Sequence, residues 1–313
     1  MSMDAGPLIG RIVEQIQRVN GVAAVVLGGS RARGTHTPES DIDLGIYYHP
    51  DHPLDLTALS RIATQLDDEH RPNLLTSIGG WGPRINGGGW LKIEGMAVDF
   101  LCRDLKAVEE SIDDCAAGEV EIFHQPGHPF GFVSSTYMAE VALCRPLRDN
   151  TGAIHRLKSR TQPYPTPLKR ALIAKFFWES DFSLMIARKA IPRADVSYAA
   201  GACFRAVGCM LQVLFAVNEQ YWLNEKGAVA LADTFPIRPG DLKTRVESAF
   251  ELFSRNQSKI KLGIDQIASL VADVHALLSQ FNAASETSPR TPPPHRAIST
   301  ARPNHPSPPA RGR

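Results

Sequence analysis

The chain has little cysteine and no grouping of cysteine with histidine that suits a metal. Its 313 residues contain five cysteines and no Cys-x-x-Cys pair. All five stand within apolar patterns, so we expect reduced core residues and no disulfides. We expect no zinc site, because no His and Cys residues cluster at ligand spacing. The cysteines are Cys102, Cys115, Cys144, Cys203 and Cys209.

Signals for export and for membrane insertion are also missing. The opening residues, MSMDAGPLIGRIVEQ, have no basic segment followed by an apolar stretch, so we expect no secretory signal. No apolar segment is long enough, on this interpretation, to span a bilayer. Together these absences predict a cytoplasmic protein without a membrane partner.

A large charge of either sign is absent as well. The formal net charge is +1, and residues 284–313 alone contain five Arg and one Glu, so the remaining chain is slightly acidic. The folded part therefore has no basic composition of the kind that predicts a nucleic-acid surface. Residues 284–313 also hold eight prolines and almost no apolar side chains. Such a segment buries too little surface to offset its ordering entropy, so we expect a disordered, Pro-rich C-terminal tail.

What is present in the first half is an alternation of helical and strand patterns. Apolar spacing predicts helices over residues 8–19 and 54–66, and strands over residues 22–27 and 41–48. These elements predict an α/β domain with a mixed β-sheet over residues 1–134.

A glycine- and tryptophan-rich segment leads into a predicted hairpin. Residues 91–102 alternate as two strands that turn at Glu94-Gly95, and Asp104 is placed to cap the following helix. The preceding segment, Gly79 to Trp90, has two interpretations that the sequence leaves open. It is either a mobile flap that closes over a base or an acceptor, or an irregular connection whose tryptophans pack on the sheet.

The second half is predicted to be helical. Long apolar-periodic segments cover residues 135–147, 167–190, 195–218 and 260–281. We therefore expect a helical bundle over residues 135–283. The predicted fold class is α/β plus α, with the tail following the bundle.

The strongest functional signal joins a glycine turn to two aspartates on a strand. Gly28-Gly29-Ser30 follows the first strand, and Asp41 and Asp43 project to one face of the next because they are two residues apart. Asp99, on the later hairpin, is the natural third carboxylate. Two Mg²⁺ ions held by such carboxylates can neutralise phosphate charge, while the turn offers backbone N–H groups to phosphates.

These residues resemble the DNA polymerase β-like nucleotidyltransferase superfamily. Its signature, Gly-Ser, a spacer, Asp-x-Asp and a later acidic residue, is matched by Gly29-Ser30, Asp41-Ile42-Asp43 and Val98-Asp99-Phe100. The form of the motif is most similar to small bacterial nucleotidyltransferases. These include aminoglycoside and lincosamide adenylyltransferases and minimal nucleotidyltransferase antitoxins. By motif, the resemblance covers residues 20–105.

The resemblance implies a reaction and a set of residue roles. Asp41, Asp43 and Asp99 are expected to be catalytic and to hold two Mg²⁺ ions, with the terminal phosphates bound by Gly28, Gly29 and Ser30. The expected reaction transfers AMP from ATP to a hydroxyl of a small-molecule acceptor and releases pyrophosphate. The alternative is an antitoxin-like or regulatory module that modifies or binds a protein or RNA partner.

Two basic residues are further candidates for phosphate binding. Arg31 and Arg33 flank the turn, and Arg33 either contacts phosphate or pairs with a nearby carboxylate such as Asp43. Lys226, in the helical half, either reaches across a cleft to phosphate or is solvated behind an Asn224 cap. The sequence leaves both choices open.

Overall fold

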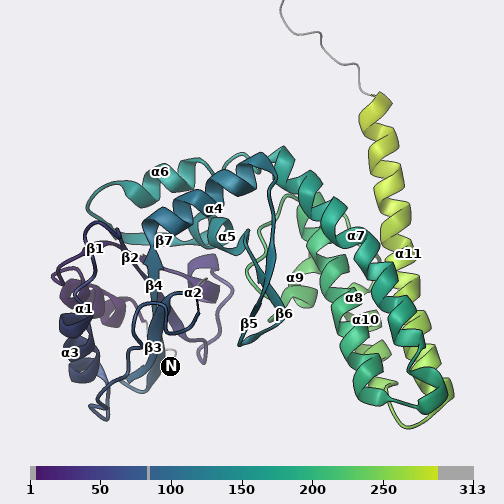
Figure 1. The fold of residues 1–313 in the computed structure, drawn as a ribbon, viewed down its shortest axis with the longest axis horizontal. Helices are drawn as coiled ribbons and strands as arrows, with labels where there is room; N and C mark the ends of the chain where they lie inside the picture. Colours follow the sequence, from purple (N-terminus) through teal and green to yellow (C-terminus); the bar gives the residue numbers. More distant parts are fainter. Residues whose placement is uncertain (1–4, 83–84, 288–313) are drawn as a thin grey trace, which may run out of the picture. The chain divides into compact units, whose positions relative to one another are not determined.

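A computed structural model describes residues 5–82 and 85–287 of the chain. The chain divides into two compact units, Met1–Leu277 and Leu278–Arg313. All strands within the described residues, and the candidate site, lie in the first unit, and Figure 1 labels its helices and strands.

The main element of the first unit is a mixed five-stranded sheet in the order β3-β4-β2-β1-β7. β2 and β4 are parallel, and the other neighbouring strands are antiparallel. A separate two-stranded sheet pairs β5 with β6. The strands are β1 (Val22–Leu27), β2 (Ile42–Tyr48), β3 (Gly87–Ile93), β4 (Met96–Asp104), β5 (Ile122–Gln125), β6 (His128–Val133) and β7 (Arg145–Asp149).

The core lies on one face of this sheet. α1 and α3 contact each other, and they also contact β1 and β3 respectively. Alternate strand residues such as Ile42, Leu44 and Phe100 join the buried cluster on this face. Because successive strand side chains alternate between faces, Asp43 and Asp99 project to the opposite face. The helices of this part are α1 (Gly6–Ile16), α2 (Gly29–Arg33), α3 (Leu56–Leu66), α4 (Leu105–Ala117), α5 (Thr136–Leu143) and α6 (Ala153–Ser159).

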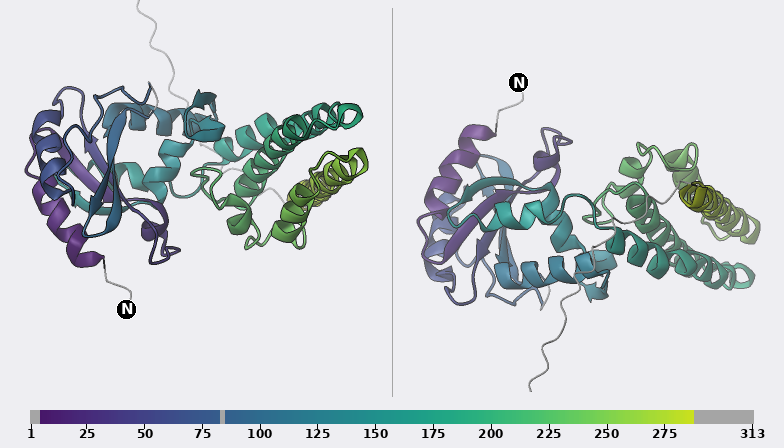
Figure 2. Two further views of the ribbon diagram at one scale, coloured as in Figure 1. Left: turned by 90° about the horizontal axis from the view of Figure 1, so that it is seen from below. Right: turned by 90° about the horizontal axis from the view of Figure 1, so that it is seen from above.

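The second half is helical, as predicted. α7 and α8 pack against each other, and the ribbon views in Figure 2 show the helical half from two sides. The predicted domain limits at residues 134 and 283 stay predictions. α11 continues through Thr287, and residues 288–313 of the predicted tail lie outside the described residues. The elements are α7 (Thr166–Arg188), η1 (Ile191–Arg193), α8 (Val196–Val217), α9 (Ala228–Ala232), α10 (Leu242–Glu251) and α11 (Gln257–Thr287).

The prediction of one helix over residues 135–147 was wrong at its C-terminal end. α5 ends at Leu143, and β7 then pairs antiparallel with β1 at the edge of the sheet. Pro146 explains the change, since it lacks an N–H group and disfavours helical backbone at Arg145. An edge strand tolerates a proline that a helix interior does not.

The three glycines Gly87 to Gly89 belong to β3, and not to a loop as predicted. The strand needs them because other backbone comes very close. A Cβ on Gly89 would lie 2.4 Å from the Leu74 carbonyl oxygen, and one on Gly88 would lie 1.9 Å from the Phe100 carbonyl oxygen. The flap interpretation therefore fails for these glycines, while residues 83 and 84 of the same segment lie outside the described residues.

Two described helical segments are long and apolar enough to cross a membrane by length and composition alone, against the expectation from the sequence. They are α8 and residues Gln257–Gln280 of α11. In α8, 72% of the most apolar window is buried inside the protein. Core helices of soluble proteins pass the same test, so these segments are weak support for membrane insertion.

Candidate active site

Four neighbouring strands bring one row of residues together on the face of the sheet opposite the core, which is called the open face below. Asp43 in β2 pairs with Asp99 in β4 in parallel register. The Gly28 N–H, just after β1, donates to the Asp43 carbonyl oxygen at 2.8 Å. On the other side Asp99 pairs with Trp90 in β3. Directly paired residues share a face and neighbouring strands are about 4.8 Å apart, so the row runs Gly28, Asp43, Asp99, Trp90.

The glycine turn touches the carboxylate of Asp43. Gly29 has φ +59°, and a Cβ at this position would lie 1.8 Å from Asp43 Oδ2. Both the backbone angle and the available space therefore favour glycine. The turn continues directly into the short helix α2, for which Gly28 is the N-cap residue. This geometry places the start of α2 against the Asp43 carboxylate.

Arg31 holds the loop that leads into β2. Its Nε atom donates to the carbonyl oxygens of Ser40 and Asp41 at 3.1 and 3.0 Å, and its Nη2 atom donates to Ser40 at 2.7 Å. The Ser40 hydroxyl oxygen in turn accepts from the Thr37 N–H at 2.9 Å. Arg31 is therefore engaged with the loop backbone, where it fixes the approach to Asp43.

Burial and mutual repulsion disfavour ionisation of the two paired aspartates. Burial raises the pKa of Asp99 to about 7, with further contributions from Asp43 and Asp41. Burial also raises the pKa of Asp43, and the charge of Asp41 adds to this effect. Asp41 lies just before β2 and is not among the residues that line the pocket around Asp43 and Asp99. The sheet thus presents a pair of carboxylates, with Asp41 acting at longer range.

The predicted basic residues lie near this pair without bonding to it. In the part of the chain that the structure describes, no hydrogen bond or ion pair engages the Arg33 side chain. Burial lowers the pKa of Arg33, while Asp43 opposes that effect. Lys226 is exposed, its backbone N–H donates to Asn224 Oδ1 at 3.0 Å, and its charge lowers the pKa of Asp43. The predicted helix cap at Asn224 was wrong, because α9 begins at Ala228 with Gly227 as its N-cap residue and the Asn224 contact lies in the preceding loop. Phosphate contacts by Ser30, Arg33 and Lys226 stay predictions.

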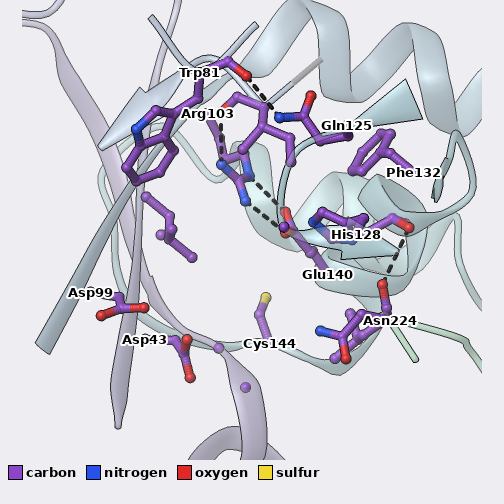
Figure 3. A pocket seen from close by; sticks show the side chains of 18 of the residues that line it. Asp43, Trp81, Asp99, Arg103, Gln125, His128, Phe132, Glu140, Cys144 and Asn224 are labelled. Atoms are coloured by element: carbon purple, nitrogen blue, oxygen red, sulfur yellow. Dashed lines mark hydrogen bonds and ion pairs between the residues drawn. The ribbon is translucent and has the colours of Figure 1, made fainter. Parts of the chain in front are cut away.

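Asp43 and Asp99 line a cavity of about 700 Å³ on the open face of the sheet. Figure 3 shows both carboxylates on one side of the cavity, with His128, Phe132 and Asn224 across from them. The size suits a small-molecule ligand. Gly28 and Gly29 also line the cavity, so the predicted turn and two of the three predicted aspartates open onto one space.

A buried ion pair forms part of the cavity wall. Arg103 Nε and Nη2 bond to the two carboxylate oxygens of Glu140, each at 2.8 Å (Figure 3). Arg103 is only 4% exposed, and it also donates to the carbonyl oxygens of Cys102 and Ile85. Burial alone would lower the pKa of Arg103, but Glu140 holds it above its ordinary value. Arg103 thus supplies the counter-charge of Glu140, whose carboxylate still contributes to the raised pKa of Asp43.

Sequence reasoning missed most of the cavity wall. Arg103 alternates with core residues in β4, so a strand pattern could have placed it on the face of Asp99. The others come from segments far apart in the chain and carry no local motif. They are Gln125, His128, Phe132 and Glu140.

The donor set suits Mg²⁺ held jointly with a substrate. Within residues 5–82 and 85–287, no three His, Cys, Asp or Glu side chains form a group that could hold a metal alone. Mg²⁺ is commonly bound by one or two carboxylates together with substrate phosphates and water. Asp43 and Asp99 supply two hard oxygen donors with excess negative charge, so these residues fit the expected ion when a triphosphate is present.

Two family models match the chain. Residues 9–80 match the nucleotidyltransferase domain, and residues 132–226 match a domain of unknown function (DUF4037). No curated protein matches it. A crystal structure of a nucleotidyltransferase-like protein from Exiguobacterium sibiricum is similar over 88% of this chain and 78% of that chain, at 9% identity and a TM-score of 0.39. The glycine turn and Asp43 lie inside the first matched segment, so residues 9–80 are similar to a nucleotidyltransferase domain at the motif that the sequence singled out.

Proposed function

We propose that the protein transfers AMP from ATP to a hydroxyl group of a small molecule and releases pyrophosphate. The observation that carries this proposal is the pairing of Asp43 with Asp99 in register, beside a glycine turn that touches Asp43. That arrangement sets phosphate-binding backbone next to two carboxylates on rigid strands. Catalysis of phosphoryl transfer depends mainly on such positioning and on charge stabilisation.

The proposed roles follow the row of residues across the sheet. Gly28, Gly29 and Ser30 hold the terminal phosphates of the nucleotide, and Arg33 and Lys226 add positive charge near them. Asp41, Asp43 and Asp99 hold Mg²⁺, which when bound would neutralise phosphate charge.

In the proposed reaction the acceptor oxygen attacks the α-phosphorus. A new phosphorus–oxygen bond forms, and the bond from the α-phosphorus to the oxygen bridging to the β-phosphate breaks. Pyrophosphate leaves with the electron pair of that bond. Asp99 accepts the proton from the acceptor hydroxyl, because it lies on the side of Asp43 away from the turn.

The small-molecule class of acceptor is supported by the cavity. Its volume of about 700 Å³ can enclose a drug-sized molecule. The slightly acidic composition of the chain before residue 284 gives no support to a nucleic-acid acceptor. The antitoxin-like or regulatory alternative predicts modification or binding of a protein or RNA partner instead.

The test is transfer of label from α-³²P-ATP, with GTP, CTP and UTP alongside, in the presence of Mg²⁺. Acceptors are a panel of hydroxyl-bearing small molecules, including aminoglycosides and lincosamides, and separately a cell extract. We expect label in a small-molecule product and release of pyrophosphate. Asp43→Asn and Asp99→Asn should each lower the rate at least 100-fold.

Asp114→Asn is the matched control because Asp114 is an exposed aspartate on α4, outside the cavity. It should leave the rate unchanged. Circular dichroism of each variant checks that the fold is retained. Label that appears only in protein or RNA would favour the alternative. Full activity of both site variants would overturn the assignment of Asp43 and Asp99.

A further inference from the structure

Two stacked tryptophans stand beside the carboxylate pair. The Trp81 and Trp90 rings are 4.7 Å apart between centroids, with an interplanar angle of 28°. Both line the cavity, and Trp90 pairs with Asp99 across the β3–β4 ladder. Trp90 is nevertheless 61% exposed, which is unusual for so large an apolar side chain. An aromatic face next to a proposed catalytic carboxylate is thus open to a ligand.

Hydrogen bonds to the Trp81 backbone and packing on β3 hold this aromatic pair in place. Gln125 Nε2 donates to the Trp81 carbonyl oxygen at 2.8 Å (Figure 3). The backbone N–H of Trp81 donates to the Asn86 carbonyl oxygen at 3.3 Å. A Cβ on Gly88 would lie 2.9 Å from the Trp81 ring, so the ring rests directly on the backbone of β3. The platform is therefore built into the fold before any ligand arrives, which lowers the entropy cost of binding.

The direction of the reaction assigns this platform to one substrate. In an in-line displacement, the attacking oxygen and the leaving group lie on opposite sides of the phosphorus. The row across the sheet runs from Gly28 through Asp43 and Asp99 to Trp90. If pyrophosphate leaves toward the glycine turn, the attacking hydroxyl comes from the side of Trp90, about three strand spacings or roughly 14 Å from Gly28.

We propose that Trp81 and Trp90 form the wall of the acceptor subsite and select acceptors that carry a ring with a flat apolar face. Sugar, aminocyclitol and aromatic rings all present such a face, and acyclic alcohols do not. Stacking on Trp90 places a ring hydroxyl beside Asp99, where the proton is accepted. This inference rests on the proposed nucleotidyl transfer and names the substrate class for the same site.

The test compares ring-bearing and acyclic hydroxyl compounds as acceptors of label from α-³²P-ATP. The ring probes are glycosides, aminocyclitols and phenols, and the acyclic probes are glycerol and serine. We expect the wild-type enzyme to favour ring probes. Trp90→Ala should raise the KM for the best ring probe about ten-fold, and Trp90→Phe should restore most of the loss. The affinity for α,β-methylene-ATP, measured by equilibrium dialysis, should not change in either variant.

Trp178→Ala is the matched control, because Trp178 is also 61% exposed but lies on α7, outside the cavity lining. It should leave the KM for the ring probe unchanged. If Trp90→Ala weakens binding of the ATP analogue and spares the ring probe, the nucleobase occupies the platform and the inference is overturned. Preferred transfer to acyclic probes overturns it as well. In both cases transfer that still depends on Asp43 leaves the proposed function standing, whereas loss of that dependence removes the proposed function itself.

Discussion

Replacing Asp99 with Asn should stabilise the metal-free protein, and more so at high pH. Burial raises the pKa of Asp99 from its ordinary 3.8 to about 7, and the neighbouring Asp43 and Asp41 add to the shift. In the unfolded chain the carboxyl ionises near pH 4, so between pH 4 and 7 the unfolded state binds fewer protons than the folded state. The free energy of unfolding therefore falls as pH rises through this window. Asn carries no charge and removes this term.

The magnitude follows from the size of the shift. A change from 3.8 to about 7 corresponds to about 4 kcal/mol at pH 8 as an upper limit. Solvent at the open side of the cavity screens the charge, so we expect about half, or roughly 2 kcal/mol. At pH 5 the folded carboxyl is still protonated, and the pH is only slightly above the ordinary pKa of 3.8, so the expected gain falls below about 1 kcal/mol. Urea unfolding with EDTA present, at pH 5 and pH 8, measures both values.

Asp114→Asn serves as the control, since an exposed helix position should change stability by less than about 0.5 kcal/mol at either pH. An Asp99→Asn gain of the same size at pH 5 and pH 8 would refute the electrostatic explanation, as would a loss at pH 8. Adding Mg²⁺ with α,β-methylene-ATP should then stabilise the wild-type protein more than Asp99→Asn. Equal stabilisation would show that Asp99 does not contribute to binding the ion.

Two further substitutions test the turn and the ion pair. Gly29→Ala should lower nucleotidyl transfer at least 100-fold, because the added Cβ would lie 1.8 Å from Asp43 Oδ2. The control is Gly34→Ala, where φ is also positive (+72°) but no atom lies within 4 Å of the added Cβ. It should cost only about 1 kcal/mol of stability and leave the rate unchanged. Similar rates for the two variants would contradict the contact. Arg103→Met should cost about 3 kcal/mol in urea unfolding because it leaves Glu140 without its partner, and adding Glu140→Met should recover part of that loss. A double variant no more stable than Arg103→Met would show that the pair contributes little through its charges.

Elements with strong local signals could be predicted from the sequence. The apolar run of β1 and the spacing of Asp41 and Asp43 predicted two strands whose bounds the structure reproduces within one residue. Asp104 was predicted as a cap, and its carboxylate accepts the N–H groups of Lys106 and Ala107. These features depend on residues close together in the chain, which is why propensity and periodicity detect them.

Elements that depend on contacts with distant parts of the chain could not be predicted. β7 pairs with β1 across more than a hundred residues, and its sequence, RPLRD, has no strand alternation of apolar residues. β3 begins with three glycines, which disfavour a strand on propensity alone. The backbone at Leu74 and the ring of Trp81 require them, and both contacts exist only in the folded chain. Tertiary packing thus overrides local preference at both edges of the sheet.

The difference between local signals and long-range contacts also explains why the sequence indicates the reaction more clearly than the acceptor. Gly28, Gly29 and Asp43 fall within sixteen positions, so one short motif contains the proposed nucleotide-binding side of the site. The rest of the cavity wall comes from β3, the β5–β6 pair, α5 and the segment before α9, which the chain brings together only on folding. Changes in those segments can reshape the wall of the proposed acceptor subsite without disturbing the glycine and aspartate motif. Acceptor preference should therefore vary with the cavity wall while the chemistry stays with the row of glycine and aspartate.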